Sequence, residues 1–322
     1  MALADRAVTV YANIIDLIGN TPIVDISALS PNPRVRILTK LEGQNPGGSV
    51  KDRAAKSMIE EAEKDGSLRP GQTILESSSG NTGIALAMIA KIKGYPFKVV
   101  LPDNVSVERR QALEVWGAEI IPSDAAGGSN GAMRKAQELA AEHPDWWFPY
   151  QYGNPSNPKA HYEGTGPEIW RDVPEITHFI AGLGTAGTLM GVGRFLKERN
   201  PDIELWAVEP PSGEMVDGLK NFDEGFIPPV FTDANGFELL DRKKIVGTRE
   251  SIEWTRRLTE VGVFAGISSG AIVAAAVKCA AEIDEGVIVT ITCDSGWKYL
   301  STGAWTGDID DVVDRARKII YF

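Results

Sequence analysis

One lysine of this sequence stands in a context suited to covalent chemistry. Lys51 follows a Pro-Gly-Gly-Ser turn in residues 45–53 and opens an amphipathic run over residues 50–62. Glycines let a backbone approach a ligand closely, and a helix start offers unpaired N–H groups and the positive end of the helix dipole. A cation is unfavourable there, so a lowered pKa would make Lys51 a nucleophile and a base. The alternative is a solvated lysine in a first helical turn.

A turn rich in hydroxyl groups follows the next predicted strand. Residues 77–83 read Ser-Ser-Ser-Gly-Asn-Thr-Gly and lie between a buried strand, 73–75, and a helix, 84–93. Backbone N–H groups and hydroxyls at a helix start suit a carboxylate or a phosphate. Ser79 or Asn81 could instead cap the helix. Three serines before Gly-Asn-Thr-Gly exceed what capping needs, which favours contact with a ligand.

A second glycine-rich turn suits a phosphate group. Residues 182–188 read Gly-Leu-Gly-Thr-Ala-Gly-Thr, directly after a strand, 177–181, and directly before a helix. Backbone amides, the helix dipole and the hydroxyls of Thr185 and Thr188 would form the phosphate cup. The same turn fits G-x-G-x-x-G, and Glu209 ends the next strand, as in dinucleotide-binding folds. An NAD-dependent oxidoreductase that uses residues 182–187 therefore stays open as an alternative.

A third turn completes a set that one cofactor explains. Residues 266–270, Gly-Ile-Ser-Ser-Gly, open an apolar helix that extends to residue 283 and, taken alone, read as a serine N-cap. Together with the lysine, the phosphate cup and the other polar turn, they predict pyridoxal phosphate. The lysine would form a Schiff base, the cup would hold the phosphate, and a polar side chain would meet the pyridine nitrogen.

Strands and helices alternate along the chain and must position these turns. The predicted strands are 23–26, 35–41, 73–75, 97–101, 119–121, 177–181, 205–209 and 287–292, and the predicted helices are 51–66, 84–93, 108–116, 130–142, 188–199, 251–261, 269–283 and 309–318, with a long loop at 210–241. This pattern indicates an α/β fold with two open, twisted, mainly parallel sheets covered by helices. Ligands of such sheets bind at the carboxyl ends of the strands. A dense turn at 153–158 is the candidate domain junction.

The composition bounds the class of protein. A chain of 322 residues with 43% hydrophobic and 24% charged residues fits two globular domains. The formal net charge of −11 argues against nucleic acid and against an anionic membrane surface as partners. The start of the chain resembles no signal peptide, and the apolar run 261–281 contains Ser268, Ser269 and Lys278, so it predicts a buried helix rather than a membrane span.

Cysteine and histidine usage points to a protein without disulfides or metal. Cys279 and Cys293 form no CxxC pair, which suits a reducing cytoplasm, and each is expected to be a small core residue. His143, His161 and His178 lack metal-ligand spacing, so no metal site is predicted.

Taken in order, the motifs resemble the cysteine synthases, which belong to fold type II of the pyridoxal-phosphate enzymes and share the tryptophan synthase β-like fold. The resemblance covers nearly the whole chain, through residues 19–22, 45–53, 79–83, 151–155, 184–188 and 266–270. Residues 106–110 and 296–303 look most like the B-type enzymes, especially the actinobacterial enzymes that use O-phosphoserine.

The resemblance implies a role for each matching residue. Lys51 would form the internal aldimine and remove the substrate α-proton. Asn81 would bind the cofactor ring hydroxyl, and Ser268 would meet the pyridine nitrogen. The phosphate would be held by Gly184, Thr185, Ala186, Gly187 and Thr188, and the substrate carboxylate by Ser79, Thr82 and Gln151, with Ser78 a further candidate.

The implied reaction is a β-replacement that makes L-cysteine from an O-activated serine through an external aldimine and an α-aminoacrylate. A hydroxyl such as that of Ser268 does not keep the pyridine nitrogen protonated, which disfavours long-lived carbanions and favours β-elimination. O-phosphoserine is the favoured substrate and O-acetylserine the other. Lys220, in the loop 210–241, is the candidate that reads the phosphate, where the O-phosphoserine enzymes carry arginine; a solvated loop lysine is the alternative.

The resemblance also implies an organisation and partners. The smaller domain would comprise residues 42–153, the larger one residues 1–41 plus 154–322, and the cofactor would lie in the cleft between them. The sulfur donor would be sulfide or a thiocarboxylated sulfur-carrier protein, and the enzyme would be a cytoplasmic homodimer. Residues 294–305 resemble a tail that covers the active site; the alternative is an ordinary final strand and turn. A cystathionine β-synthase or dehydratase type of lyase is a further alternative.

Overall fold

The alternation of strands and helices produces two separate sheets in the computed structural model, which describes residues 10–318 except 79, 104 and 106. The larger sheet has the order β1-β2-β9-β6-β7-β8, and only β1 runs antiparallel to its neighbour. Its strands are β1 (Ile23–Asp25), β2 (Val35–Leu41), β6 (His178–Gly182), β7 (Glu204–Glu209), β8 (Arg242–Ile245) and β9 (Gly286–Thr292). The smaller sheet is parallel, with the order β3 (Ile74–Glu76), β4 (Phe97–Pro102) and β5 (Glu119–Ser123).

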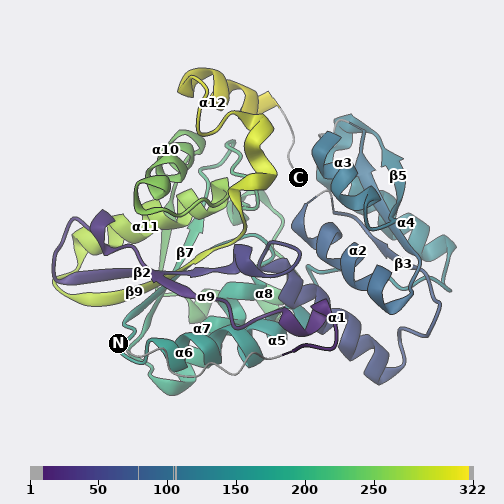
Figure 1. The fold of residues 1–322 in the computed structure, drawn as a ribbon, viewed down its shortest axis with the longest axis horizontal. Coiled ribbons are helices and arrows are strands. Elements are labelled where there is room, and N and C mark those ends of the chain that lie inside the picture. Colours follow the sequence, from purple (N-terminus) through teal and green to yellow (C-terminus); the bar gives the residue numbers. More distant parts are fainter. Residues whose placement is uncertain (1–9, 79, 104, 106, 319–322) are drawn as a thin grey trace.

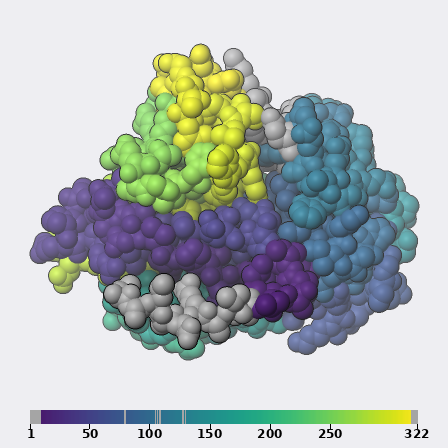
Figure 2. All heavy atoms as spheres, in the orientation of Figure 1, coloured from purple at the N-terminus to yellow at the C-terminus, as the bar shows by residue number. Residues whose placement is uncertain are grey.

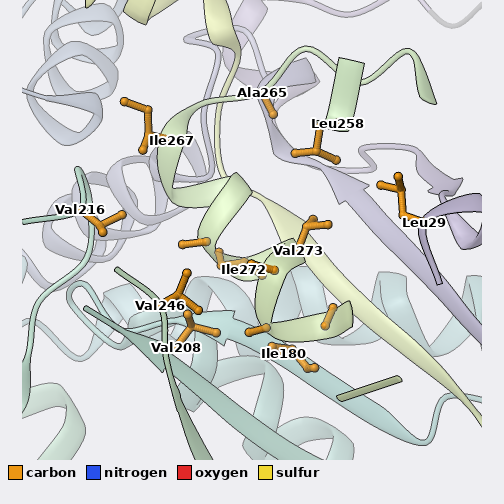
Figure 3. Packing of buried hydrophobic residues seen from close by; sticks show 14 of the residues in the cluster. Leu29, Ile180, Val208, Val216, Val246, Leu258, Ala265, Ile267, Ile272 and Val273 are labelled. Carbon is orange, nitrogen blue, oxygen red and sulfur yellow. The ribbon is translucent and has the colours of Figure 1, made fainter. Parts of the chain in front are cut away.

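Helices cover both faces of the larger sheet because its central strands are apolar on both sides. Ile180 and Val208 pack with α10 (Thr248–Leu258) and α11 (Ile267–Glu282), whereas Phe179 and Leu205 pack with α6 (Gly166–Asp172) and α7 (Gly187–Arg199). The two helix layers lie on opposite sides of the strands in Figure 1. Figure 3 shows α11 contributing Ile272 and Val273 to the first of these cores.

The smaller sheet is covered in the same way. Ile74 and Val99 pack with α1 (Lys51–Asp65) and α2 (Asn81–Lys93), and Leu75 and Val100 pack with α4 (Gly128–Glu142). Helix α3 (Val107–Glu114) lies beside this sheet, so the blue part of the chain forms a body of its own next to the rest in Figure 2. Helix α12 (Ile309–Lys318) packs on α10. Within the described part of the chain, none of the helices has the length and apolar character that a bilayer span requires.

The predicted strands and helices are present in the structure as strands and helices. The differences are additional short or polar elements that the sequence did not predict. The structure adds α5 (Ser156–Ala160), α6 and the strand β8, which carry no apolar periodicity strong enough to predict them. The predicted loop 210–241 contains two short helices, α8 (Pro229–Asp233) and α9 (Gly236–Leu239). Residues 296–302 form a 3-10 helix, η8 (Gly296–Thr302), so the alternative of an ordinary final strand and turn is wrong for this segment.

Candidate active site

A cavity of about 170 Å³ lies at the carboxyl ends of β3, β6 and β9, as expected for parallel sheets. It brings together every predicted site residue that the structure describes; Ser79 lies outside the described residues. These lining residues are Lys51, Ser78, Asn81, Thr82, Gln151, Gly184, Thr185, Ala186, Gly187, Thr188, Lys220 and Ser268. Residues from six separate segments of the chain therefore share one cavity.

Lys51 is the first residue of α1 and lines the cavity. Burial lowers the pKa of its ammonium group, while Cys293 and Asp294 act in the opposite direction. Desolvation is therefore the largest cause of the lowered pKa of Lys51. A partly buried amine with a lowered pKa suits both nucleophilic attack and proton transfer, and the solvated-lysine alternative is wrong.

The glycine-rich turn after β6 forms a cradle at the start of α7. Ala186, the N-cap, has φ +65° and makes no side-chain cap, and the first-turn N–H of Gly187 has only a long contact of 3.4 Å to Thr185 Oγ1. A Cβ atom on Gly184 would lie 2.5 Å from the Gly218 carbonyl oxygen, and one on Gly187 would lie 2.0 Å from Asn157 Oδ1. This left-handed residue and the two close approaches make a concave nest of amides that suits a phosphate.

Asn157 and His161 support this cradle, and the motifs alone did not indicate them. Asn157 Nδ2 donates to the backbone oxygen of Gln151 at 2.9 Å and to Thr185 Oγ1 at 3.0 Å, so it joins two predicted site segments. His161 Nε2 lies 3.2 Å from Thr188 Oγ1. Burial, together with Arg53 and Lys51, holds the pKa of His161 well below its usual value, so this imidazole is neutral.

The serine-rich turn after β3 meets Gln151. Helix α2 begins at Asn81 with Gly80 as its N-cap and no side-chain cap, so Asn81 does not cap the helix. Thr82 Oγ1 donates to Gln151 Oε1 at 2.7 Å, which joins two residues predicted to hold a carboxylate. The side-chain amide of Gln151 and the N–H groups at the start of α2 then provide donors for an anion.

Ser268 lies in the first turn of α11, beside the thiol of Cys293. The N-cap of α11 is Gly266, which has no side chain, so the serine-cap interpretation of residues 266–270 is wrong. Cys279 belongs to the core, as predicted, whereas Cys293 lines the cavity as well as packing against the core. Its position after β9 is the only sequence signal that could have indicated this.

Lys220 reaches the cavity from the segment between β7 and α8. Its backbone N–H donates to the Leu183 carbonyl oxygen at 2.6 Å, which attaches this segment to the glycine-rich turn. Its Nζ lies 5.3 Å from the Tyr152 ring centre and 5.6 Å from that of Phe226. Burial lowers the pKa of Lys220, opposed by Glu224. The interpretation as a solvated loop lysine is wrong.

The residues that line the cavity without having been predicted as site residues include Arg109, Asp217, Lys298 and Tyr299. Arg109 on α3 pairs with Asp217, and its guanidinium lies 5.9 Å from the Tyr299 ring centre. Arg109 belongs to residues 106–110, and Lys298 and Tyr299 belong to residues 296–303, two motifs noted in the sequence, whereas Asp217 lies in the predicted loop 210–241. Only the fold brings these two motifs to one place.

Glu209, the acid of the dinucleotide alternative, does not reach the cavity. It is fully buried, accepts a hydrogen bond from Lys243 Nζ at 2.7 Å and one from the Phe222 N–H at 3.3 Å. Its carboxylate is therefore committed to the interior of the protein, away from any ribose in the cleft.

Glu76, directly before the serine turn, makes stability depend on pH. Its Oε1 accepts the Ser77 N–H at 2.7 Å, and burial raises its pKa from 4.5 to about 7. Because the pKa is higher in the folded protein than in the unfolded chain, folding favours the protonated form of Glu76 over its charged form. The contribution of Glu76 to the free energy of unfolding is therefore complete below pH 4.5 and is lost as the pH rises through 7. We expect Glu76→Gln to gain about 3 kcal/mol over the parent between pH 5 and pH 8 in urea unfolding. Glu60→Gln, at an exposed position on α1, is the control; equal pH profiles for parent and Glu76→Gln would contradict the assignment.

Known proteins with the same motifs and fold identify the family. Residues 14–294 match the model of the pyridoxal-phosphate dependent enzymes. Cysteine synthase B of Pseudomonas aeruginosa is 43% identical over 297 residues, which are 92% of this chain and 98% of that protein.

Solved structures agree with this assignment. An O-ureido-L-serine synthase superimposes with a TM-score of 0.86 at 38% identity, covering 93% of this chain and 96% of its own. Isoform 3 of O-acetylserine sulfhydrylase from Entamoeba histolytica superimposes with a TM-score of 0.87 at 34% identity, covering 98% of this chain and 99% of its own. The predicted fold type and cofactor are thereby confirmed, and the dinucleotide alternative is wrong. The chain belongs to the cysteine synthases, pyridoxal-phosphate dependent enzymes that form L-cysteine from an O-activated serine.

Proposed function

We propose that the activated serine is O-phosphoserine and that its phosphate is read by Lys220. The cavity residues fit the cofactor, because the nest at Gly184–Thr188 suits its phosphate and Lys51 lies in the same cavity. In this proposal Asn81 faces the cofactor ring hydroxyl and Ser268 faces the ring nitrogen. When bound, pyridoxal phosphate supplies an electron sink for the charge left on the substrate α-carbon.

The side chains of the chain supply the rest of the chemistry. Lys51 takes the α-proton, since its lowered pKa makes the neutral amine available. The hydroxyl of Ser268 is a poor proton source for the ring nitrogen, which favours prompt loss of the β-substituent. The substrate carboxylate is assigned to Ser78, Ser79, Thr82 and Gln151, of which Thr82 and Gln151 already share a hydrogen bond.

The position of Lys220 carries the choice of O-phosphoserine. Among the described residues Lys220 forms no salt bridge, and its Nζ lies over the aromatic faces of Tyr152 and Phe226, with Glu224 acting from farther away. An ammonium group in a low-dielectric pocket attracts a phosphate dianion much more strongly than a neutral ester. Lysine provides this charge without the bidentate fork of an arginine.

Replacement of Lys220 tests the substrate. We expect Lys220→Met to raise the KM for O-phosphoserine about tenfold, because one charge-assisted hydrogen bond is lost, and to leave the KM for O-acetylserine within about twofold. Steady-state kinetics with both substrates and excess sulfide measure the two effects. Lys220→Arg keeps the charge and is the matched control. An equal change for the two substrates would show that Lys220 does not read phosphate.

O-acetylserine is the competing substrate, because one structural relative is named as an O-acetylserine sulfhydrylase. A parent enzyme whose kcat/KM for O-acetylserine exceeds that for O-phosphoserine would replace the first proposal by this one. The same assay with homocysteine as acceptor tests the cystathionine alternative.

The sulfur donor in this proposal is sulfide or the thiocarboxylate of a sulfur-carrier protein. Trp297 and Leu300 on η8 are 71% and 55% exposed next to the cavity residues Lys298 and Tyr299, which leaves an apolar surface at that position. We also propose that the enzyme is a cytoplasmic homodimer and that residues 42–153 form the smaller domain of each subunit. Light scattering measures the mass, and comparison of turnover with sulfide and with a thiocarboxylated carrier identifies the donor.

A further inference from the structure

A second lysine contacts the residue assigned to the cofactor ring. Lys298 on η8 donates from Nζ to Asn81 Oδ1 at 2.6 Å and to the Gly47 carbonyl oxygen at 2.9 Å. Its side chain is partly buried. Burial lowers the pKa of Lys298, and the carboxylates of Asp294 and Asp52 act in the opposite direction. One ammonium group thus joins η8, the turn before Lys51 and the start of α2.

The contacts of Asn81 determine which way its amide points. Asn81 Nδ2 donates to Asp294 Oδ2 at 2.8 Å, and the same oxygen accepts from the Tyr299 hydroxyl at 2.7 Å. A lysine ammonium only donates and a carboxylate only accepts, so the reverse orientation of the amide would break both contacts. The second N–H of Nδ2 is not used in these contacts.

We infer that Lys298 is a positioning residue that holds the Asn81 amide so that its remaining N–H faces the cofactor ring hydroxyl. This inference rests on the proposed placement of Asn81. The positively charged ammonium group of Lys298, hydrogen-bonded to the amide oxygen of Asn81, also withdraws electron density from the amide. This makes the amide N–H a stronger donor. A stronger donor favours a negatively charged ring oxygen, and removal of Lys298 weakens that preference.

The test measures cofactor binding to the apoenzyme, through quenching of tryptophan fluorescence. We expect Lys298→Met to weaken binding of pyridoxal phosphate about tenfold, since a hydrogen bond to a charged group is lost. The 3-deoxy analogue of the cofactor lacks the ring hydroxyl, so its dissociation constant should stay within about twofold of the parent value. Lys298→Arg should restore most of the affinity for pyridoxal phosphate.

Controls separate this role from a general loss of structure. Lys64→Met makes the same chemical change at an exposed position on α1, where it should not alter either dissociation constant. If the thermal unfolding of apo Lys298→Met shows that it is not folded, Lys298→Gln is used, which keeps a donor without the charge. Its affinity for pyridoxal phosphate should lie between those of the parent and Lys298→Arg on one side and Asn81→Ala on the other.

The outcomes distinguish this inference from the proposed placement of Asn81. In an Asn81→Ala background, Lys298→Met should have no further effect, because the two residues act as a unit. A normal affinity in Asn81→Ala would overturn the placement of Asn81 and the inference with it. Weak binding in Asn81→Ala but normal binding in the Lys298 variants, or equal weakening for both ligands in Lys298→Met, would overturn only the role of Lys298.

Discussion

Replacement of Lys51 with alanine is expected to remove the visible absorbance of the bound cofactor and to lower kcat at least about 1,000-fold. The cavity places this amine beside the glycine-rich nest, and burial lowers its pKa. A positioned proton-transfer group contributes 10²–10⁴-fold to the rate, and the covalent attachment of the cofactor is lost as well. Absorbance spectra and steady-state turnover of the same preparation measure both effects.

The matched control for this prediction is on the same helix. Lys64 lies in the last turn of α1, its side chain is 76% exposed, and Lys64→Ala should keep both the spectrum and turnover of the parent. Turnover at the parent rate in Lys51→Ala would show that the reacting amine belongs to another residue.

Replacement of Arg53 with methionine is expected to lower the free energy of unfolding by about 3–5 kcal/mol. Arg53 Nε donates to Glu42 Oε2 at 2.7 Å, and its two terminal nitrogens donate to Glu168 at 2.7 Å. Lys40 Nζ lies 2.8 Å from Glu168 Oε2. All four side chains are at least nine-tenths buried, so loss of one cation leaves an uncompensated buried charge. Urea unfolding of the apoenzyme measures the difference.

The pH dependence of this effect has a defined sign. Burial opposes ionisation of Glu168, but hydrogen bonds and charges from Arg53 and Lys40 outweigh it and lower its pKa from 4.5 to about 2. A lowered pKa gives stability that is present above pH 4.5 and is lost as the pH falls toward 2. The difference between parent and Arg53→Met should therefore shrink below pH 4.5. Arg171→Met, where the side chain is 59% exposed, should change stability by no more than about 0.5 kcal/mol; an equal loss in both variants would contradict the argument.

The sequence predicted the parts of the fold that local patterns control. Two kinds of element form close to their predicted positions: the apolar strands that begin at residues 35, 178 and 286, and the helices that follow glycine-rich turns. Their positions could be predicted because periodicity and turn chemistry are local properties. The short helices at 156–160 and 229–233 were missed, since proline and polar residues at their starts read as loop. Tertiary packing stabilises them instead, as Val230 and Phe231 show by their burial.

By itself, the sequence determined that the chain carries a lysine, a phosphate nest and polar turns at helix starts, because their chemistry lies in adjacent residues such as those at 184–188. Only the tertiary structure decided which distant residues complete the site. Lys298 meets Asn81 across 217 positions of the chain, and Arg109 meets Asp217 across 108. No local pattern encodes such a pairing, because it exists only after the strands have placed their carboxyl ends at one cavity. The same burial lowers the pKa of Lys51 and raises that of Glu76, since desolvation is a property of the folded protein.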